Sequence, residues 1–420
     1  MTYPVIYDHN NSRYLPYTLG MVIFIAFVAA VFTYTALCIH KGLFSDEHFH
    51  APQIWHIFAD KEMLDNKITV PLTYHYIIGF TVQKIGTYHD NLLRLISLLV
   101  AFSTIPLFYK LFALKTPFYA DVRCLQLFFL PLAYIYYFLL YTDIWALGLI
   151  GLNLYLALRN YYAWSALVGL AAVVLRQDSI IWIGLTFLLI CSDQIQSVSK
   201  QNFYLLIRNA FTKGLLYLPI FIGFIAFLIV NEGVALGDKN MHNTGLVNVA
   251  NVYLFLILAW VLFLPLNIQS IGIIFYFFKT HTFLKLLGLI VLFLAYMASF
   301  ENAHPYNKTH LHFFLHNGMA HYLTVNTLYK ALSFIPAIWM ALTLCLMRLQ
   351  EARFKWMLIV IPFALALHPM IDPRYYLPAF LLIQIIRPPV SRNTEFVTLC
   401  AYIMISAYVV LGTIKSYFFL

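Results

Sequence analysis

Two carboxylates and two imidazoles lie close together in the segment Ser45-Asp46-Glu47-His48-Phe49-His50. A carboxylate held beside a hydroxyl group can take its proton and act as a general base. The segment follows the first long apolar run of the chain and precedes every other one. We therefore expect acid–base chemistry at a membrane surface, with Asp46 preferred as the base and Glu47 sharing the role or positioning a substrate. His50 is interpreted as a partner of these carboxylates or as a simple interfacial residue, with the first reading preferred.

Further polar and aromatic groups punctuate the ends of later apolar runs, on the same predicted side as Asp46. They are Asp143, Arg176, Gln177, Asp178, Asp238, Lys239, His242, His304, Tyr306, Arg374 and Tyr375. Arginine presents a planar fork that fits a phosphate or a carboxylate, so Arg176, Lys239 and Arg374 are candidate phosphate ligands. The alternatives stay open: Asp143 and Asp178 are also suited to capping the helices that follow them. Arg176 is equally suited to an ion pair with either of them, and Arg374 to a structural turn.

The elements that carry these groups are apolar runs of membrane-spanning size. The chain of 420 residues is 62% hydrophobic and only 10% charged, whereas soluble domains carry about 25% charged residues. A membrane-spanning helix needs about 20 apolar residues. We predict an all-α polytopic membrane protein forming one domain over residues 1–420, with about 13 spans and a range of about 11 to 14. They are placed near 16–40, 91–113, 124–142, 143–158, 161–175, 179–192, 214–231, 250–278, 284–300, 323–347, 356–368, 376–387 and 396–416.

Charge separates the two sides of this predicted bundle. Lys and Arg accumulate in cytoplasmic loops, and on our assignment one side receives short basic loops while the other receives most carboxylates and nearly every histidine. The second side is the working face. Its longest loop, residues 41–90, has apolar and polar residues at helical spacing, which predicts structured interfacial helices. Packing of this loop on the bundle and a substrate-facing role remain equal alternatives.

Several other functions are excluded or weakened by composition. The net charge of +9 comes from basic residues dispersed singly at helix ends, so we expect no nucleic-acid partner. The five cysteines show no Cys-x-x-Cys pair, so we expect neither a disulfide framework nor a cysteine metal site. A zinc site among His310, His312, His316 and His321 is a weaker reading than hydrogen bonding, because no His-Glu-x-x-His set is present; we expect no metal and no cofactor. Asn307-Lys308-Thr309 fits a glycosylation acceptor, which requires a lumenal or extracellular face.

A bundle with carboxylates, cations and aromatics at one aqueous face suits a substrate that is half lipid and half polar, such as a sugar on a polyprenyl phosphate. Displacement of the phosphate at the anomeric carbon requires a base for the attacking hydroxyl. It also requires cations for the departing phosphate. A transporter of lipid-linked sugars is the alternative from another class, but it predicts charges near mid-span and internal repeats; the charges here sit at one face, and we find no repeat.

Ordered sequence blocks add a resemblance to this reading. They are Asp46-Glu47-x-Phe49-His50-x-Pro52-Gln53, Asp65-x-x-Ile68-Thr69-x-Pro71, Tyr141-Thr142-Asp143, Arg176-Gln177, Gly237-Asp238-Lys239-x-x-His242, His304-Pro305-Tyr306 and Pro373-Arg374-Tyr375-Tyr376. The set resembles the dolichyl-phosphate-glucose-dependent α-1,2-glucosyltransferases, which add the last glucose to the lipid-linked oligosaccharide for N-glycosylation.

The resemblance implies a GT-C-type glycosyltransferase bundle in the endoplasmic reticulum membrane, with its active site facing the lumen. It implies the catalytic carboxylate in the first lumenal loop, residues 41–90, inversion at the anomeric carbon and no required metal. The implied partners are dolichyl phosphate glucose as donor, the diglucosylated lipid-linked oligosaccharide as acceptor, and membrane lipid. A related transferase that uses another polyprenyl-phosphate sugar is the enzymatic alternative.

Overall fold

The computed structural model describes residues 18–39, 42–61, 65–193, 195, 200–242, 247–309 and 313–420. Across these residues the chain folds into helices and connecting turns, and the β-structure is limited to one isolated bridge between Phe313 and Phe419. The prediction of an all-α protein is therefore confirmed.

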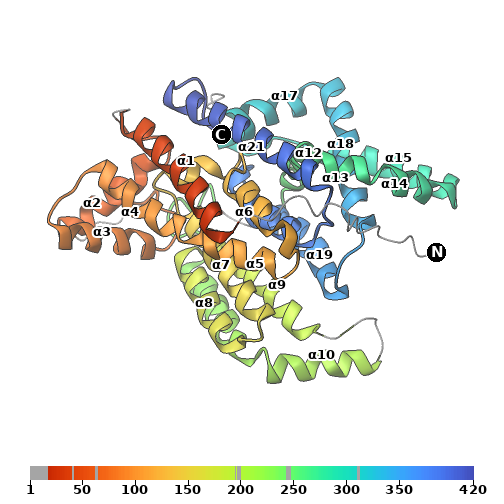
Figure 1. Cartoon of the computed structure of the whole chain (residues 1–420), viewed down its shortest axis with the longest axis horizontal. Helices are drawn as coiled ribbons and strands as arrows, with labels where there is room; N and C mark the ends of the chain where they lie inside the picture. Colours follow the sequence, from red (N-terminus) through yellow and green to blue (C-terminus); the bar gives the residue numbers. More distant parts are fainter. Residues whose placement is uncertain are drawn as a thin grey trace.

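The helices are numbered along the chain as in Figure 1. The first half of the chain contains α1 (Leu19–Ile39), α2 (Glu47–Phe58), α3 (Thr73–Ile85), α4 (Asp90–Phe102), α5 (Thr104–Ala113), α6 (Ala120–Phe128), α7 (Asp143–Leu158), α8 (Tyr162–Leu175), α9 (Ile180–Cys191) and α10 (Lys200–Thr212). The second half contains α11 (Leu218–Asn231), α12 (Ala250–Leu262), α13 (Leu264–Gln269), α14 (Ile271–Lys279), α15 (Thr282–Ser299), α16 (Pro305–Lys308), α17 (Ala320–Val325), α18 (Thr327–Leu346), α19 (Lys355–Ala366), α20 (Leu377–Ile386) and α21 (Arg392–Ile414).

Five helical segments among the described residues are long and apolar enough to cross a membrane. They are α1, the continuous pair α4 and α5, α15, α18 and α21, and the bent pair of α10 and α11 would make a sixth. Four shorter apolar helices accompany them, formed by α7, α8, α9 with the turn before it, and α12. The chain is thus a helical membrane protein, but the predicted number of about 13 spans is not confirmed.

The predicted span 124–142 is wrong. Helix α6 ends at Phe128, and residues 129–142 follow an irregular path in which nearly every side chain is buried. This apolar run faces protein rather than lipid. Irregular backbone at membrane depth is tolerated only where protein or an enclosed cavity surrounds it, and hydropathy alone does not distinguish the two surroundings.

Two other predicted spans also differ from a single membrane-spanning helix. Residues 250–278 form three successive helices, α12, α13 and α14, with breaks near Pro265 and Ser270. Helix α20 has ten residues and is buried along its whole length. At 1.5 Å per residue it extends only about 15 Å, half the thickness of a bilayer core. It is a core helix of the protein.

Helix α7 lies at the centre of the fold and packs against α5, α8, α9 and α20. Figure 1 shows α2, α3 and α4 gathered on one side of it, with α14 and α15 projecting on the opposite side. Only 6% of the most apolar stretch of α15 is buried within the protein, as expected for a lipid-facing helix. Helices α2 and α3, within the predicted loop 41–90, pack on each other.

Several basic residues of the predicted cytoplasmic side pair with acidic residues outside the cavity described below. Arg387 binds Glu395 through Nη1 and Nη2, each 2.7 Å from a carboxylate oxygen. Arg392 binds Asp121, and Arg353 binds Asp193 at 3.0 Å. The first two pairs connect the end of α20 and α6 to α21, and the third connects the turn before α19 to the end of α9. None of these carboxylates lines the cavity.

Candidate active site

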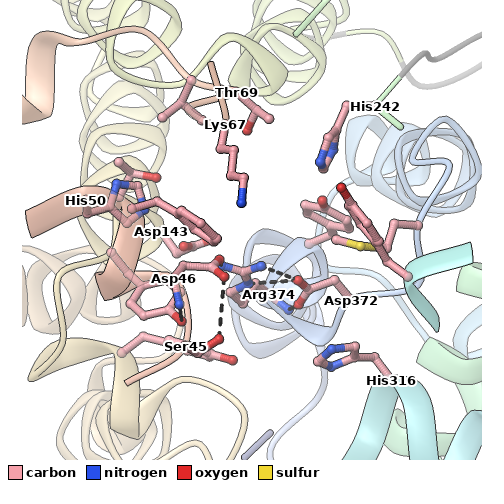
Figure 2. Close-up of a pocket in the computed structure, with 18 of the residues that line it drawn as sticks. Ser45, Asp46, His50, Lys67, Thr69, Asp143, His242, His316, Asp372 and Arg374 are labelled. Atoms are coloured by element: carbon pink, nitrogen blue, oxygen red, sulfur yellow. Dashed lines mark hydrogen bonds and ion pairs between the residues drawn. The ribbon is translucent and has the colours of Figure 1, made fainter. Parts of the chain in front are cut away.

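A cavity of about 620 Å³ opens among segments that are far apart in the sequence. Its walls come from the start of α2, the loop at 67–70, the segment before α7, the junction of α8 and α9, the loop after α11, the turn before α20 and the C-terminal residues. Tyr306, Phe313, His316 and Asn317 complete the lining. Figure 2 shows the polar side chains of this cavity converging from these elements. The predicted working-face residues are thus largely brought into one place.

Asp46 and Arg374 meet at the floor of the cavity. Arg374 Nη1 lies 2.6 Å from Asp46 Oδ2, and Arg374 Nε lies 2.8 Å from Asp372 Oδ2. One guanidinium group therefore bridges two carboxylates, as Figure 2 shows. The Arg374 guanidinium also stands 5.0 Å from the centroid of the Tyr141 ring. The Tyr141 hydroxyl accepts a hydrogen bond from the Asp46 backbone N–H.

This arrangement keeps Asp46 ionised. Burial by itself would raise the pKa of the Asp46 carboxyl, but the adjacent Arg374 guanidinium outweighs it, and the pKa lies below its usual range. The Asp46 side chain remains 35% exposed to the cavity. An unprotonated, accessible carboxylate is what a general base requires.

Arg176 is held by two carboxylates in the same way. Its Nη1 lies 2.5 Å from Asp143 and its Nε lies 3.0 Å from Asp178. The ion-pair alternative left open by the sequence is therefore the arrangement seen, and Arg176 still lines the cavity with Asp143. Neither aspartate is an N-cap: Asp143 is the first residue of α7, and Thr142 precedes it as the cap residue. Asp178 lies outside the cavity lining.

Glu47 does not line the cavity, although it neighbours Asp46. Its carboxylate is fully buried and pairs with Arg94, with Nε 2.9 Å from Oε1 and Nη2 2.5 Å from Oε2. The backbone N–H groups of Phe44 and Leu140 donate to the same carboxylate, each at 2.9 Å. With its oxygens engaged in this way, Glu47 joins α2, α4 and the segment before α7, and it is not placed to share the role of base.

His50 lines the cavity and is backed by a second histidine. His50 Nδ1 lies 2.8 Å from Nε2 of His75, which is completely buried on α3. Burial lowers the pKa of His50 to about 4 and also lowers the pKa of His75 well below its usual value, so both imidazoles are uncharged at neutral pH. His50 thus lies in the cavity wall, but its hydrogen-bond partner is His75, and its predicted role as a partner of the carboxylates stays a prediction.

The opposite wall carries Asp238, His242 and Tyr306. The Tyr306 hydroxyl donates to Asp238 at 2.7 Å, and His242 Nε2 lies 3.8 Å from the same carboxylate. Burial lowers the pKa of His242. Tyr375 also lines the cavity and stacks on His368 with 3.8 Å between ring centroids.

Three other predicted site residues lie outside the cavity lining. Gln177 donates to the backbone carbonyls of Thr69 and Val234, and so connects two loops. The Lys239 ammonium group donates to the carbonyl of Asn231. His304 bonds the Met241 carbonyl and caps α16. Each of these side chains is used to hold a loop near the site.

Sequence reasoning missed several groups of the cavity. Asp372, Lys67, Tyr141 and His316 line it without having been chosen as site residues. Lys67 and Tyr141 did fall in or beside the sequence blocks quoted above, and this was the available signal. Asp372 stands two residues before Arg374 on the predicted working face.

Two further readings can be compared with the described residues. Among them, no three metal-ligating side chains gather into a cluster; His310 and His312 lie outside the described residues. Asn307, the proposed glycosylation acceptor, is fully buried, and its side-chain amide donates to the Ile371 carbonyl at 2.8 Å. An asparagine bonded in this way is not accessible for glycosylation, so that reading is corrected.

The segments that carry the predicted cavity residues also match a known protein family. The model of the DIE2/ALG10 family matches residues 40–385. The chain belongs to this family. The matched region begins just before Asp46 and extends beyond Tyr375, so it includes every cavity residue predicted from the sequence.

Curated relatives from fungi and an insect are similar to the chain. The Candida albicans protein is 26% identical with 97% of each chain covered, and the Debaryomyces hansenii protein is 31% identical with 56% of each chain covered. The Drosophila melanogaster protein is 26% identical over 74% of this chain and 80% of its own. All three are named Dol-P-Glc:Glc(2)Man(9)GlcNAc(2)-PP-Dol alpha-1,2-glucosyltransferase. No solved structure matches the chain.

Proposed function

We propose that this protein transfers glucose from dolichyl phosphate glucose to the terminal glucose of a diglucosylated lipid-linked oligosaccharide, forming an α-1,2 linkage. Membership of the DIE2/ALG10 family and the names of the relatives support this reaction. The observation that carries it to a site is the ionised Asp46 carboxylate, open to a cavity of about 620 Å³.

The proposed reaction is one displacement with inversion. The acceptor hydroxyl oxygen bonds to the anomeric carbon of the donor glucose, and the bond from that carbon to the phosphate oxygen breaks. The bonding electron pair leaves with dolichyl phosphate, and the hydroxyl proton passes to Asp46. A carboxylate in hydrogen-bond reach of the attacking hydroxyl supplies general-base catalysis worth about 10²- to 10⁴-fold in rate.

The remaining cavity residues are proposed to bind the substrates. Arg374 aligns Asp46 through the 2.6 Å ion pair, and Arg176 aligns Asp143. Hydroxyl groups of the two sugars are suited to hydrogen bonds with uncharged imidazoles, phenols and carboxylates. These contacts are assigned to His50, Asp143, Asp238, His242, Tyr306 and Tyr375.

We propose that the chain adopts a GT-C-type bundle in the endoplasmic reticulum membrane with the cavity facing the lumen. The five long apolar helices would span the bilayer, and the shorter apolar helices would complete the bundle among them. The predicted loop 41–90, with α2 and α3, would then lie at the lumenal interface. Access of a probe to single cysteines placed in this loop, from the lumenal side of sealed microsomes, tests this orientation.

The reaction is tested by incubating the purified protein in lipid with dolichyl phosphate glucose and the diglucosylated acceptor. We expect a triglucosylated product carrying one new α-1,2 bond, identified by mass and by linkage analysis. Dolichyl phosphate mannose and the monoglucosylated acceptor serve as controls that should give no product. The proposal would be contradicted if this protein transferred no glucose under conditions in which a family member, assayed as a positive control, transfers it.

A further inference from the structure

The cavity is lined by four aspartates and by three cations, of which two, the arginines, form ion pairs with carboxylates. The aspartates are Asp46, Asp143, Asp238 and Asp372. Arg374 is bound by two carboxylates, and so is Arg176. The positive charge of each guanidinium group is thus already offset by two carboxylates, and a phosphate that approached its remaining N–H groups would be repelled by both of them. Both arginines are therefore poorly placed as the first cation that a phosphate meets.

Lys67 differs from both arginines. It lines the cavity, and within the described part of the chain no carboxylate oxygen lies within 4.0 Å of its ammonium nitrogen. The nitrogen stands 5.0 Å from the centroid of the Phe49 ring. Figure 2 shows its side chain extending into the cavity, with the ammonium group pointing into the open space between His50 and His242.

The loop that carries Lys67 is held firmly. The backbone N–H of Asp238 donates to the Asn66 carbonyl at 2.8 Å, and that of Leu236 donates to the Thr69 carbonyl at 3.1 Å. Gly237 permits this contact, because a Cβ there would lie 2.3 Å from the Asn66 carbonyl oxygen. Two loops remote in sequence are thereby joined on either side of Lys67. This connection fixes the point from which its side chain enters the cavity.

We propose that the Lys67 ammonium group is the cation that binds the phosphate of the lipid-linked sugar donor, whereas Arg374 and Arg176 position the carboxylates. The inference rests on the proposed function and adds a residue to it. Inversion places the base and the leaving phosphate on opposite sides of the anomeric carbon. Asp46 and Lys67 enter the cavity from different elements, the start of α2 and the 65–70 loop. As the anomeric bond breaks, the phosphate gains a second negative charge, and a fixed cation stabilises it where it develops.

The test compares Lys67→Met with Lys239→Met in the reconstituted transfer assay. Both changes remove one exposed loop ammonium group, but Lys239 lies outside the cavity and binds the Asn231 carbonyl. A charge-assisted hydrogen bond to a phosphate corresponds to a loss of roughly 10- to 100-fold in kcat/KM for the donor. We expect that loss for Lys67→Met and less than about a twofold change for Lys239→Met. Lys67→Arg, which keeps the charge, should recover most of the activity.

Two further measurements locate the phosphate and exclude a folding defect. Inhibition by added dolichyl phosphate should weaken about 10-fold or more in Lys67→Met, while KM for the acceptor stays unchanged. A rise in the acceptor KM alone would assign Lys67 to the acceptor pyrophosphate and overturn the inference. Unchanged donor kinetics and unchanged inhibition in Lys67→Met and in Lys67→Gln would also overturn it, with the transferase activity of the wild type intact. Failure of the wild type to transfer glucose would instead contradict the proposed function.

Discussion

Oδ2 of Asp46 lies 2.6 Å from Nη1 of Arg374, although 328 residues separate the two along the chain. The same guanidinium group binds Asp372 in the turn before α20. The start of α2 is thereby connected to the start of α20 through one side chain. Asp46 is held in a single orientation and remains ionised, the two conditions that a carboxylate base needs before its substrate arrives.

Asp46→Asn is expected to abolish glucose transfer without unfolding the protein. The amide keeps the size of the side chain but cannot accept the proton of the attacking hydroxyl, so kcat should fall by about 10²- to 10⁴-fold. The measurement is the initial rate of transfer at saturating donor and acceptor, together with the thermal unfolding midpoint. Asp46→Glu is the matched control that retains a carboxylate. Transfer at the wild-type rate by Asp46→Asn would exclude Asp46 as the base.

The pH dependence of transfer reports on the same ion pair. Because Arg374 keeps the pKa of Asp46 below its usual value of about 3.9, the carboxylate stays ionised as the pH falls from about 7 to about 5. We expect no loss of rate over this range from Asp46. The Asp46–Arg374 pair also stabilises the folded protein at neutral pH. This stabilisation is lost only as the pH falls through the lowered pKa of Asp46.

Arg374→Met should move the acidic limb of the rate profile to higher pH. Burial and the neighbouring Asp372 both raise the pKa of Asp46 once the guanidinium is removed. The residual activity of this variant should therefore decline at a pH where the wild type is still fully active. Arg374→Lys keeps a positive charge and is expected to shift the limb less. An identical acidic limb in all three proteins would show that Arg374 does not control ionisation of the base.

Sequence reasoning located Asp46 because its position is unusual: a carboxylate that follows an apolar run stands at a membrane surface. It could not separate Asp46 from Glu47. Successive residues at the start of a helix point in directions about 100° apart, so only one of the two can face the cavity. Which one does depends on Arg94, which lies 47 residues further along and fixes Glu47 in the core.

The same limit explains the other differences. Lys239 is named in one quoted sequence block, whereas Lys67 occupies an unspecified position in another. The choice between these two loop lysines depends on the backbone contacts that direct Lys67 into the cavity. The span predicted at 124–142 failed because an apolar run buried in protein has the same composition as one in lipid. Local sequence predicted the helical class and five of the seven Asp, Lys and Arg residues that line the cavity. Tertiary contacts determined which side chains are free to act.

Asn307 is expected to carry no glycan even though Asn307-Lys308-Thr309 fits the acceptor pattern. Its amide donates to the Ile371 carbonyl and to Asn317, and its oxygen accepts from the Ile371 N–H at 2.9 Å. Endoglycosidase treatment should leave the mass of the proteolytic peptide that contains Asn307 unchanged. Asn307→Gln should lower stability by about 1–3 kcal/mol, because buried hydrogen bonds are lost.

Thr309→Ala is the control for Asn307. It destroys the acceptor pattern and removes only a long contact of an exposed hydroxyl with the Tyr306 carbonyl, at 3.4 Å. We therefore expect neither a change in mass nor a measurable loss of stability. A fall in mass in Thr309→Ala, matching the loss of one glycan, would show that Asn307 is glycosylated and that this part of the site differs from the structure described.

Glu47→Gln should damage folding rather than chemistry, which distinguishes it from Asp46→Asn. The change leaves Arg94 charged and without its partner in a position that is only 1% exposed. Removal of one member of a buried ion pair costs about 3–5 kcal/mol, so the thermal unfolding midpoint in lipid nanodiscs should fall clearly. At temperatures below that midpoint, the rate per folded molecule should stay close to that of the wild type. The double variant Glu47→Gln with Arg94→Met removes the unpaired charge and should recover part of the lost stability. A stable but inactive Glu47→Gln protein would return Glu47 to the reaction as a base.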